Sequence, residues 1–514
     1  MSNNSPLPAP SPMAGKNQPV DWMLAFKFNA ASFPGCTDDG VTPTVGSTGI
    51  FGGVVEEYKS GHSQQYIYAT SENPTLVKGQ GCLGATLGDP LGATFAQVYN
   101  NPGYNYVLWN DQFYGEPIAS LESPWGHSKG MAAWNDAGEG FVLQVSTPSW
   151  PGSGSRADPR NTGNTLGAIG DDDDIEVSQH FLALKINKDD LVAVLKALIN
   201  ASVATDVTQP PIVHNGGPAD VMALVNTLGI PASERTEKTP RPSALPSPPT
   251  CTTTTLSSGV QLLSKPSGLH LPPWQLVSGK LGGLSLRVAS WWASPEIYST
   301  DKGVNIEGWP SNLPQPGAVA IATTGNWNGK SIGLTGGLGT NFNHAKIGIS
   351  TDPAKPVCIF GDMNQQGALR SNYAHPGQKM DSSQNGRGGT FYVLQNKGLF
   401  DSLTQLLKGS TAGTTAPPVK APTKKTKPGT GKSKKSTTVS KKTDSKPNKK
   451  ISKKVKAKNS STVKPAAAKA TKKSAKKKVA KKKAASKRKS TPAVKAKPKT
   501  AKKSKSAATK KARK

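Results

Sequence analysis

Long apolar segments are missing from this chain of 514 residues. No stretch approaches the roughly 20 consecutive apolar residues that an α-helix needs to cross a bilayer, so the sequence predicts no helical membrane span and no membrane partner. Residues 1–19 are polar and rich in proline, without the apolar core of a secretory signal peptide. We therefore expect a cytosolic, nuclear or nucleoid-associated protein rather than a secreted one, with the nuclear and nucleoid addresses favoured.

Cysteine is also scarce, because the chain contains only Cys36, Cys82, Cys251 and Cys358. So few cysteines fit a reducing compartment, where thiols stay free. Four cysteines still allow three different pairings if the environment is oxidising, and the sequence does not choose among them.

The last hundred residues almost completely lack acidic and aromatic side chains. From Thr411 to Lys514 there are 39 Lys and Arg against one acid, Asp444, and no Phe, Trp or Tyr. Residues 1–410 hold the other 25 basic and 31 acidic residues, so their net charge is −6, whereas that of residues 411–514 is +38. Such a segment buries too little apolar surface to offset its conformational entropy, which predicts a disordered tail.

The composition of this tail resembles that of linker-histone tails, as in KKSAKKKVAKKKAASKRKS at Lys472 to Ser490. A polycation of this density binds nucleic acid by releasing counterions, whatever the base sequence. We therefore predict DNA as its partner. A solubilising tail or a nuclear localisation signal, suggested by KKKAASKRK at Lys481 to Lys489, are the alternatives.

Composition also suggests how the chain is divided. The segment from Pro231 to Gly259 is rich in Pro, Ser and Thr, which is typical of a surface connection. The 410 residues before the tail are ample for a large core of two packed halves. The expected parts are a disordered segment 1–18, a first half 19–230, a linker 231–259, a second half 260–408 and a disordered Lys-rich tail 409–514.

Two short motifs of one form carry the chemistry. Gly-His-Ser-Lys at Gly126 to Lys129 and Asn-His-Ala-Lys at Asn343 to Lys346 each place a Lys two residues after a His. Two residues apart on an extended strand, these side chains point to the same face. Two such pairs brought together supply a nucleophile, a general acid and two cations around a phosphodiester, with no metal or other cofactor.

Each motif opens the same local pattern. Apolar runs separated by turn-forming residues follow both motifs, which predicts a hairpin in each case. Farther on, each half has a strand and then an amphipathic helix, and we infer an internal duplication in which both halves donate one His-Lys pair to a shared cleft. The strands are expected at His180 to Ile186 and Thr390 to Leu394. The apolar face of the first helix consists of Leu191, Val192, Leu195, Leu198 and Ile199, and Asp189 or Asp190 is expected to cap that helix. The apolar face of the second helix consists of Leu399, Phe400, Leu403, Leu406 and Leu407.

Several blocks in this order resemble deoxyribonuclease II, an acid endonuclease. They are PVDWMLAFKF (Pro19 to Phe28), YVLWNDQ (Tyr106 to Gln112), GHSKGMAAWND (Gly126 to Asp136), NHAKIGIS (Asn343 to Ser350), IFGDMNQ (Ile359 to Gln365) and RGGTFYVLQ (Arg387 to Gln395). The resemblance covers most of residues 19–408 and is absent from the tail.

This resemblance implies an α/β (α+β) fold of the phospholipase D-like type. In such a fold, two αβ halves related by pseudo-twofold symmetry form mixed sheets covered by helices. The disordered basic tail would be an addition to it. The family's lysosomal or secreted location is the alternative to a nuclear or nucleoid one.

The resemblance also implies metal-independent hydrolysis of DNA to 3′-phosphate and 5′-hydroxyl ends. One of His127 and His344 would attack phosphorus and form a phosphohistidine, and the other would protonate the leaving 5′-oxygen and then activate water. The sequence does not decide which is the nucleophile. Lys129 and Lys346 would hold the non-bridging oxygens. The expected substrate-binding residues are Asn364, which stands where phospholipase D-like enzymes carry a phosphate-contacting Asn, together with Asn135 and Asp362.

The chain departs from the family's pattern at several positions. Asn343 and Asn135 replace acidic residues, which should lower the basicity of a neighbouring imidazole and move the pH optimum to less acidic values. The family pairs a Cys at the place of Cys358 with one after GGT, where this chain has Phe391 and Tyr392, so we expect that bridge to be absent.

Two other classes of function compete with a nuclease. A DNA-compacting protein with an inactive core is possible because Asn135 and Asn343 replace acids, although both His-Lys pairs are retained. Another phospholipase D-like phosphodiesterase usually has an Asp five residues after each motif Lys, where this chain has Trp134 and Thr351. Weaker candidates are a cation site at Asp171 to Asp174, a phosphate loop at Gly336 to Gly339, and base stacking by Trp291 and Trp292; we expect surface loops for the first two and core packing for the tryptophans.

Overall fold

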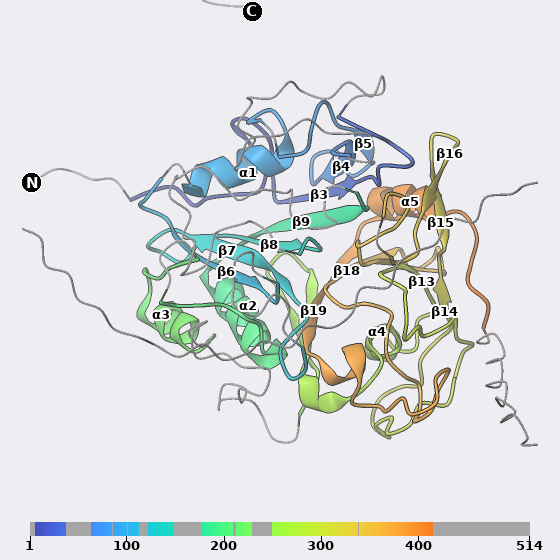
Figure 1. Cartoon of the computed structure of the whole chain (residues 1–514). Helices are drawn as coiled ribbons and strands as arrows, with labels where there is room; N and C mark the ends of the chain where they lie inside the picture. The colour runs from blue at the N-terminus through green and yellow to red at the C-terminus, as the bar shows by residue number, and fades with distance from the viewer. Residues whose placement is uncertain are drawn as a thin grey trace, which may run out of the picture. The chain divides into compact units, whose positions relative to one another are not determined.

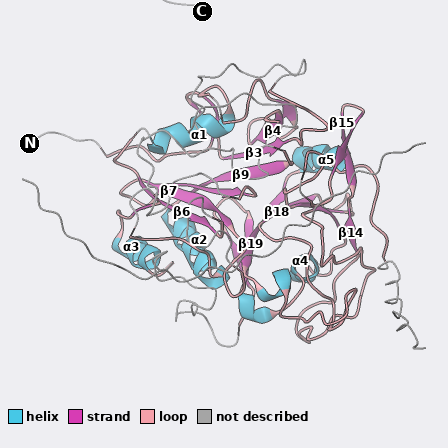
Figure 2. Ribbon diagram, in the orientation of Figure 1, coloured by secondary structure: helices cyan, strands magenta, loops and turns pink. Residues whose placement is uncertain are grey.

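Two large β-sheets, one from each half of the chain, organise the computed structural model of this protein (Figures 1 and 2). It describes residues 6–36, 63–84, 86–99, 101–112, 122–148, 176–208, 212–228, 249–337 and 339–414, all within a unit of residues 1–425. The acidic run Asp171 to Asp174 lies outside the described residues.

The first sheet has eight strands and the second has seven. In spatial order the first is β10 (Val213–His214), β6 (Asn105–Asn110), β7 (Lys129–Trp134), β8 (Gly140–Val145), β9 (Gln179–Ile186), β3 (Trp22–Lys27), β4 (Tyr66–Thr70) and β5 (Val77–Lys78). The second is β11 (Thr252–Thr255), β12 (Gln261–Lys265), β19 (Gly389–Gln395), β18 (Val357–Gly361), β17 (Ile347–Ser350), β13 (Leu286–Ala289) and β14 (Val319–Ile321). Smaller two-stranded sheets pair β1 (Met13–Gly15) with β2 (Gln18–Pro19), and β15 (Thr324–Trp327) with β16 (Lys330–Gly333).

The central five strands of the two sheets repeat one another. The order β6-β7-β8-β9-β3 in the first corresponds to β13-β17-β18-β19-β12 in the second, and every neighbouring pair is antiparallel. The duplication and the α+β architecture expected from the sequence are therefore confirmed. Only the second sheet is mixed, because β13 and β14 run parallel whereas all described pairs of the first sheet are antiparallel.

The central strands are covered on both faces, which explains their composition. Every residue of β7, β8, β17 and β18 is buried. A strand buried on both faces carries a nearly continuous apolar run in place of an alternating pattern. That is why the segments after both motifs are mostly apolar.

Five α-helices are described: α1 (Pro90–Tyr99), α2 (Lys188–Ala201), α3 (Ala219–Asn226), α4 (Pro273–Lys280) and α5 (Lys397–Leu406). Helix α2 follows β9, and α5 follows β19, in agreement with the predicted duplication. Asn187 caps α2, and Asp190 completes its capping box by accepting from the Asn187 backbone N–H. Asn396 caps α5 in the same way with its side-chain oxygen.

Helix α2 lies between the halves. It packs against β8 and β9 of the first sheet and against β12 and β19 of the second. Its buried face includes Leu191, Leu195 and Leu198, as the periodicity predicts. One continuous hydrophobic cluster joins residues of both halves, such as Leu182 and Tyr392. The two halves therefore share a core. None of the described helices is long and apolar enough to cross a membrane.

The N-terminal segment differs from its expected disorder. Of the predicted segment 1–18, residues 6–18 are packed on the first half and include β1. The Tyr104 hydroxyl donates to the Pro8 carbonyl at 2.9 Å, and Gln97 bonds with the backbone of Ser11 through both ends of its amide. A polar, proline-rich composition suggests disorder, but here tertiary hydrogen bonds fix the segment.

The expected linker and tail boundaries also shift. Residues 252–255, assigned to the linker 231–259, form the exposed edge strand β11. This follows from the high strand propensity of consecutive threonines. Residues 409–414, assigned to the tail 409–514, remain attached to the second half, because Ala412 N–H donates to Ile321 and Ser299 N–H donates to Gly413. Residues 415–514 and most of the predicted linker lie outside the described part.

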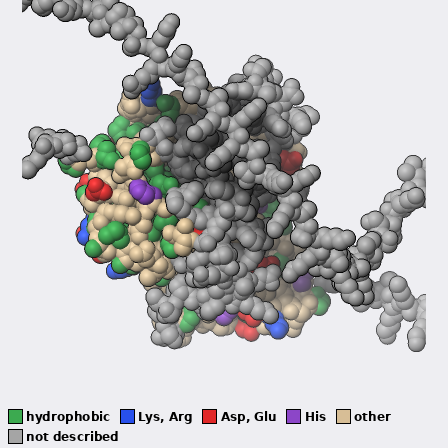
Figure 3. Space-filling model, turned by 60° about the vertical axis from the view of Figure 1, so that its left-hand side comes forward, with side chains coloured by type: hydrophobic (Ala, Val, Ile, Leu, Met, Phe, Trp, Pro, Cys, Tyr) green, Lys and Arg blue, Asp and Glu red, His purple; other side chains and the backbone are tan. Residues whose placement is uncertain are grey.

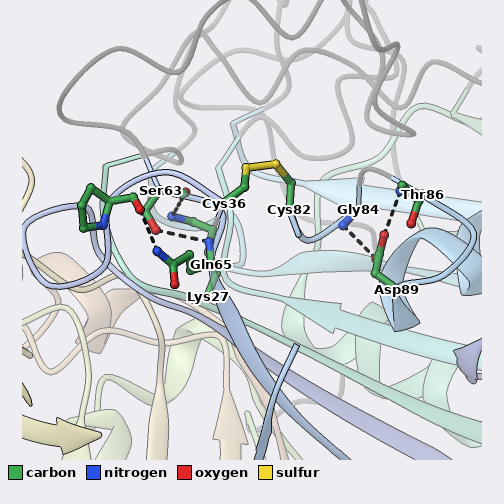
Figure 4. The surroundings of a disulfide bond; sticks show 9 residues. Lys27, Cys36, Ser63, Gln65, Cys82, Gly84, Thr86 and Asp89 are labelled. Carbon is green, nitrogen blue, oxygen red and sulfur yellow. Dashed lines mark hydrogen bonds between the residues drawn. A yellow bond between two sulfur atoms is a disulfide. The ribbon is translucent and has the colours of Figure 1, made fainter. Parts of the chain in front are cut away.

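One disulfide joins Cys36, which follows β3, to Cys82, which follows β5 (Figure 4). This bond belongs to one of the three pairings that the sequence left open, but the second bond of that pairing, between Cys251 and Cys358, does not form. Cys251 and Cys358 are buried free thiols. Lys27, which lies near the bond in Figure 4, donates to the backbone carbonyls of Phe28 and Ser63.

Charged side chains are scattered over the part of the described surface that Figure 3 draws. On the face drawn in Figure 3, Lys and Arg side chains stand singly among uncharged and acidic ones, outside the grey atoms. This agrees with the slightly negative net charge of residues 1–410.

Candidate active site

The first motif lies where the two halves meet. His127 precedes β7, and its backbone N–H donates to the Gly388 carbonyl, just before β19 of the second sheet, at 2.8 Å. Gly126 and Gly388 both approach the backbone of Ala201 at the end of α2, where an added Cβ would lie 2.5 and 2.1 Å from the Ala201 carbonyl oxygen. Both positions therefore require glycine.

The second motif is held in the reciprocal way. The backbone N–H of His344 donates to the Ser178 carbonyl, just before β9 of the first sheet, at 2.7 Å. Its ring packs edge-on against Trp291, with centroids 4.2 Å apart. The backbone of each histidine is thus hydrogen-bonded to the residue that precedes a strand of the opposite half. The structure brings the two predicted histidines together.

Both histidines line one pocket of about 710 Å³. Residues from both halves form its wall, which includes amides and hydroxyls, the two histidines, one arginine and the three carboxylates of Asp111, Glu122 and Asp381. The described lining residues are Asp111, Gln112, Glu122, Ser123, His127, Pro148, Trp291, Pro295, His344, Asn364, Gln366, Asp381, Ser382, Ser383, Gln384 and Arg387. Trp291 was expected to pack in the core and instead forms part of this wall.

A hydrogen bond determines the tautomer of His127. Its Nδ1 lies 2.7 Å from the backbone oxygen of Asp362, which can only accept. Nδ1 therefore carries the proton, and Nε2 keeps its lone pair. Nε2 has no hydrogen-bond partner among the described residues and is not among their fully buried polar atoms, so it opens onto the pocket.

A buried network of polar side chains fixes Asp362, whose backbone oxygen accepts the hydrogen bond from His127. The Asp362 carboxylate accepts from Ser128 at 2.7 Å, from Thr390 at 2.5 Å, and from Gln144 at 2.9 Å. Burial raises the pKa of Asp362, and these hydrogen bonds oppose that effect. With every carboxylate oxygen engaged in this way, the Asp362 backbone stays fixed beneath His127.

The network continues through His180 to the second motif. The Lys346 backbone N–H donates to His180 Nδ1 at 3.2 Å, so the proton of that ring is on Nε2, which donates to Gln144 Oε1 at 3.1 Å. Burial lowers the pKa of His180 to about 3, which keeps the ring neutral. Gln144 thus links His180 to Asp362, and the two motifs share one hydrogen-bonded support.

The two motif lysines lie behind the pocket wall. Lys129 and Lys346 are each only 2% exposed. The Lys129 ammonium pairs with Asp111, whose second oxygen accepts from Arg387 at 2.7 Å. The Lys346 ammonium donates to the His344 carbonyl. Because Lys129 and Arg387 both face it, the pKa of Asp111 stays well below its usual range despite burial.

Both histidines are harder to protonate than usual. Burial lowers the pKa of His127, and the neighbouring Lys129 lowers it further. For His344 the same two causes apply, burial first and Lys346 second, with Lys129 and His127 adding to the effect. Each imidazole therefore stays neutral in the free protein to a pH below 6.5.

Asn135 and Asp362 are not placed to bind substrate, contrary to expectation. Asn135 lies in the β7–β8 turn, where its side-chain oxygen accepts from the backbone of Ala137 and Glu139, each at 3.0 Å. The six residues of β7, rising about 3.3 Å each, separate it from the motif by roughly 20 Å. Asp362 contributes to the support, because its carboxylate is fully occupied there. Asn364 does line the pocket, donating to Gln366 at 2.8 Å.

Asn343 also has a local structural role. Its side chain bonds with both the N–H and the C=O of Ala345. The residue that replaces a family acid thus holds the backbone of the motif turn.

Sequence reasoning missed several residues of the site. Asp111 and Arg387 lie within the segments that resemble deoxyribonuclease II, and Gln144 and His180 lie in mostly apolar strands, but none of the four was predicted as a site residue. Their one common signal is a polar or charged residue within a mostly apolar strand or within two residues of its end. In the described part of the chain, no group of three or more His, Cys, Asp and Glu is arranged to hold a metal ion.

Comparison with known proteins adds one match. Residues 55–209 match the family model described as Deoxyribonuclease II. The matched range includes the first motif, and the second motif lies beyond it. No curated protein matches the chain.

Proposed function

We propose that this chain, whose residues 55–209 match the deoxyribonuclease II family model, is a metal-independent endodeoxyribonuclease that leaves 3′-phosphate and 5′-hydroxyl ends. The observation that carries this proposal is the convergence of His127 and His344 from the two halves on one pocket. One imidazole can attack phosphorus while the other serves the leaving oxygen, which is the arrangement needed for covalent catalysis at a phosphodiester.

His127 is the better nucleophile of the two. Its Nδ1 proton is committed to the Asp362 carbonyl, which leaves the Nε2 lone pair available toward the pocket. In the first step Nε2 forms a bond to phosphorus, and the bond from phosphorus to the 5′-oxygen breaks. His344 donates a proton to that oxygen. In the second step neutral His344 takes a proton from water, whose oxygen attacks phosphorus and displaces His127.

The general acid must be protonated when it acts. Burial and the nearby cations lower the pKa of His344 in the free protein. A bound phosphodiester brings a negative charge beside the ring, which raises this pKa and favours protonation in the complex. The buried ammonium groups of Lys129 and Lys346 do not line the pocket, so they act on this charge only through the electrostatic field of the pocket.

The end groups test the proposed chemistry directly. We expect DNA cleaved by the full-length protein in excess EDTA to accept label from polynucleotide kinase without prior phosphatase treatment. We expect terminal transferase to extend the 3′ ends only after phosphatase treatment. Ends with 5′-phosphate and 3′-hydroxyl groups, or cleavage that needs a divalent cation, would contradict the mechanism.

A change at Lys129 should move the pH profile. Lys129 lowers the pKa of both histidines, so Lys129→Met should raise both values. Both flanks of the kcat/KM profile therefore shift to higher pH, whatever happens to the maximal rate. Lys355→Met, an exposed change remote from the pocket, is the control and should leave the profile in place. A Lys129→Met profile that stayed fixed, or moved to lower pH, would show that this ammonium does not act on the histidines.

The tail is proposed to hold the enzyme on DNA. Its charge of +38 contrasts with the −6 of residues 1–410. The catalytic part thus contributes little general attraction for a polyanion, whereas the tail contributes a great deal. Sequence-independent binding through the tail raises the local concentration of phosphodiesters near the pocket.

A further inference from the structure

We propose that Arg387 is the phosphate-binding cation of the pocket, contacting a non-bridging oxygen of the scissile phosphodiester through Nη1. This inference rests on the proposed function and adds to it. The motif lysines suggest themselves for this task from the sequence, but both are buried behind the wall. Among the described residues that line the pocket, Arg387 is the only Lys or Arg.

The guanidinium of Arg387 is held along one edge. Its Nε donates to the Trp125 carbonyl at 3.0 Å, and Nη2 donates to the Gly126 carbonyl at 2.9 Å and to Asp111 at 2.7 Å. Because the group is planar with a fixed fork of donors, these bonds leave Nη1 at the opposite edge.

Nη1 is available to a ligand. It makes no hydrogen bond with any described residue, yet it is not among their buried unpartnered atoms, so it is open to the pocket. A phosphate oxygen there would complete the hydrogen bonding of a guanidinium that is already oriented. Arginine donors bind phosphate strongly because both the charge and the planar geometry match.

The backbone of Arg387 is equally well fixed. Lys265, on β12, is buried and donates to the carbonyls of Arg387 at 2.6 Å and Asn385 at 2.9 Å. The next residue, Gly388, accepts the His127 N–H. The cation and the proposed nucleophile are therefore neighbours in one rigid unit, and Arg387 itself contributes to lowering the pKa of His127.

Asp111 defines the charge of this unit. Its carboxylate bridges Lys129 and Arg387, so three charged groups carry a net charge of +1. When the free edge of Arg387 binds a phosphodiester of charge −1, the +1 charge of this unit and the charge of the phosphodiester cancel. This balance assigns Lys129 to the electrostatic support and Arg387 to contact with the substrate.

The experiment compares Arg387→Met and Arg387→Lys with Arg370→Met in the full-length chain. Arg370 is exposed and does not line the pocket, and its replacement by Met changes the net charge by the same amount. With a short oligonucleotide in EDTA, we expect Arg387→Met to lower kcat/KM about 100-fold or more, mainly in kcat. Arg387→Lys keeps the charge without the fork and should lose about tenfold. Arg370→Met should stay within about twofold of wild type.

A second measurement does not depend on catalysis. Inorganic phosphate that binds the folded pocket raises the melting temperature, whereas phosphate on the tail binds folded and unfolded chains alike and has little effect. We expect this stabilisation in wild type and Arg370→Met, a smaller one in Arg387→Lys, and none in Arg387→Met. If Arg387→Met does not fold, Arg387→Lys decides by the same two measurements.

The outcomes separate the inference from the proposed function. Wild-type rates and wild-type stabilisation by phosphate in the Arg387 variants would overturn the role of Arg387 while leaving the nuclease intact. A second outcome is that the wild-type protein does not cleave DNA, while phosphate stabilises wild type and does not stabilise Arg387→Met. That outcome would overturn the proposed function and support the phosphate site.

Discussion

Replacing either motif histidine with alanine should abolish cleavage of plasmid DNA in EDTA while leaving DNA binding nearly unchanged. In the proposed mechanism the two imidazoles act in the same bond-breaking step from opposite halves of the pocket, so loss of either removes the nucleophile or the acid. A loss of at least about 10³-fold in turnover, several kcal/mol in the barrier, is expected for His127→Ala and for His344→Ala. The measurement is single-turnover cleavage with saturating protein.

His214→Ala is the matched control, because His214 is exposed on β10 and lies outside the pocket. It should cleave at the wild-type rate. Covalent trapping then distinguishes the two histidines. With a phosphodiester whose leaving group needs no proton, such as a nitrophenyl ester, rapid acid-free quenching and mass spectrometry should find a phosphohistidine adduct on His127 in His344→Ala, and no adduct on His344 in His127→Ala. Wild-type turnover in either alanine variant would show that the paired-histidine mechanism is wrong.

Removing the tail should weaken DNA binding by orders of magnitude. A chain that ends at Thr414 keeps the strands and contacts of the second half and loses the segment that carries nearly all of the excess positive charge. Each neutralised phosphate contributes about −0.9 to the logarithmic salt slope on duplex DNA, so the steep salt dependence should flatten as well. Turnover of a saturating short substrate should scarcely change, because the pocket is untouched.

The control for truncation is a tail of the same length in which glutamine replaces lysine. A disordered chain of about 100 residues, as the composition of the tail predicts, would span roughly 55 Å root-mean-square, so length alone would affect local concentration. We expect the glutamine tail to bind DNA as weakly as the truncated chain. Tight binding of long DNA by the truncated chain, with the same salt slope as the full chain, would assign the tail to localisation or solubility.

Local patterns predicted much of this fold. The helices α2 and α5 and the strands before them follow from periodicity, which depends on residues close in sequence. Repetition of those patterns after each motif predicted the duplication, and the sheets repeat it strand for strand. The packed segment 6–18 was not predicted, because the hydrogen bonds that fix it come from residues such as Tyr104, far along the chain.

The site was predicted only in part for the same reason. His127 and His344 were found because each has a Lys two residues later, a local signal. The bridge from Lys129 through Asp111 to Arg387 joins residues 18 and 276 positions apart, and no short motif contains it. Asn135 was misassigned because an amide beside a motif strand can equally well hold a turn, and only the path of β7 decides between the two roles.

Each histidine is held by the opposite half, and this has a consequence for how the two halves could become different. His127 is fixed by Gly388 and His344 by Ser178, so neither half alone contains a complete active centre. Two identical halves would have to present two identical histidines. Joined in one chain, equivalent positions are free to differ: Asp362 and Ser146 each follow the corresponding strand and donate a backbone N–H to its neighbour, Thr390 in one half and His180 in the other. Covalent linkage thus permits broken symmetry, as the proposed mechanism requires, in which one ring attacks phosphorus and its counterpart transfers protons.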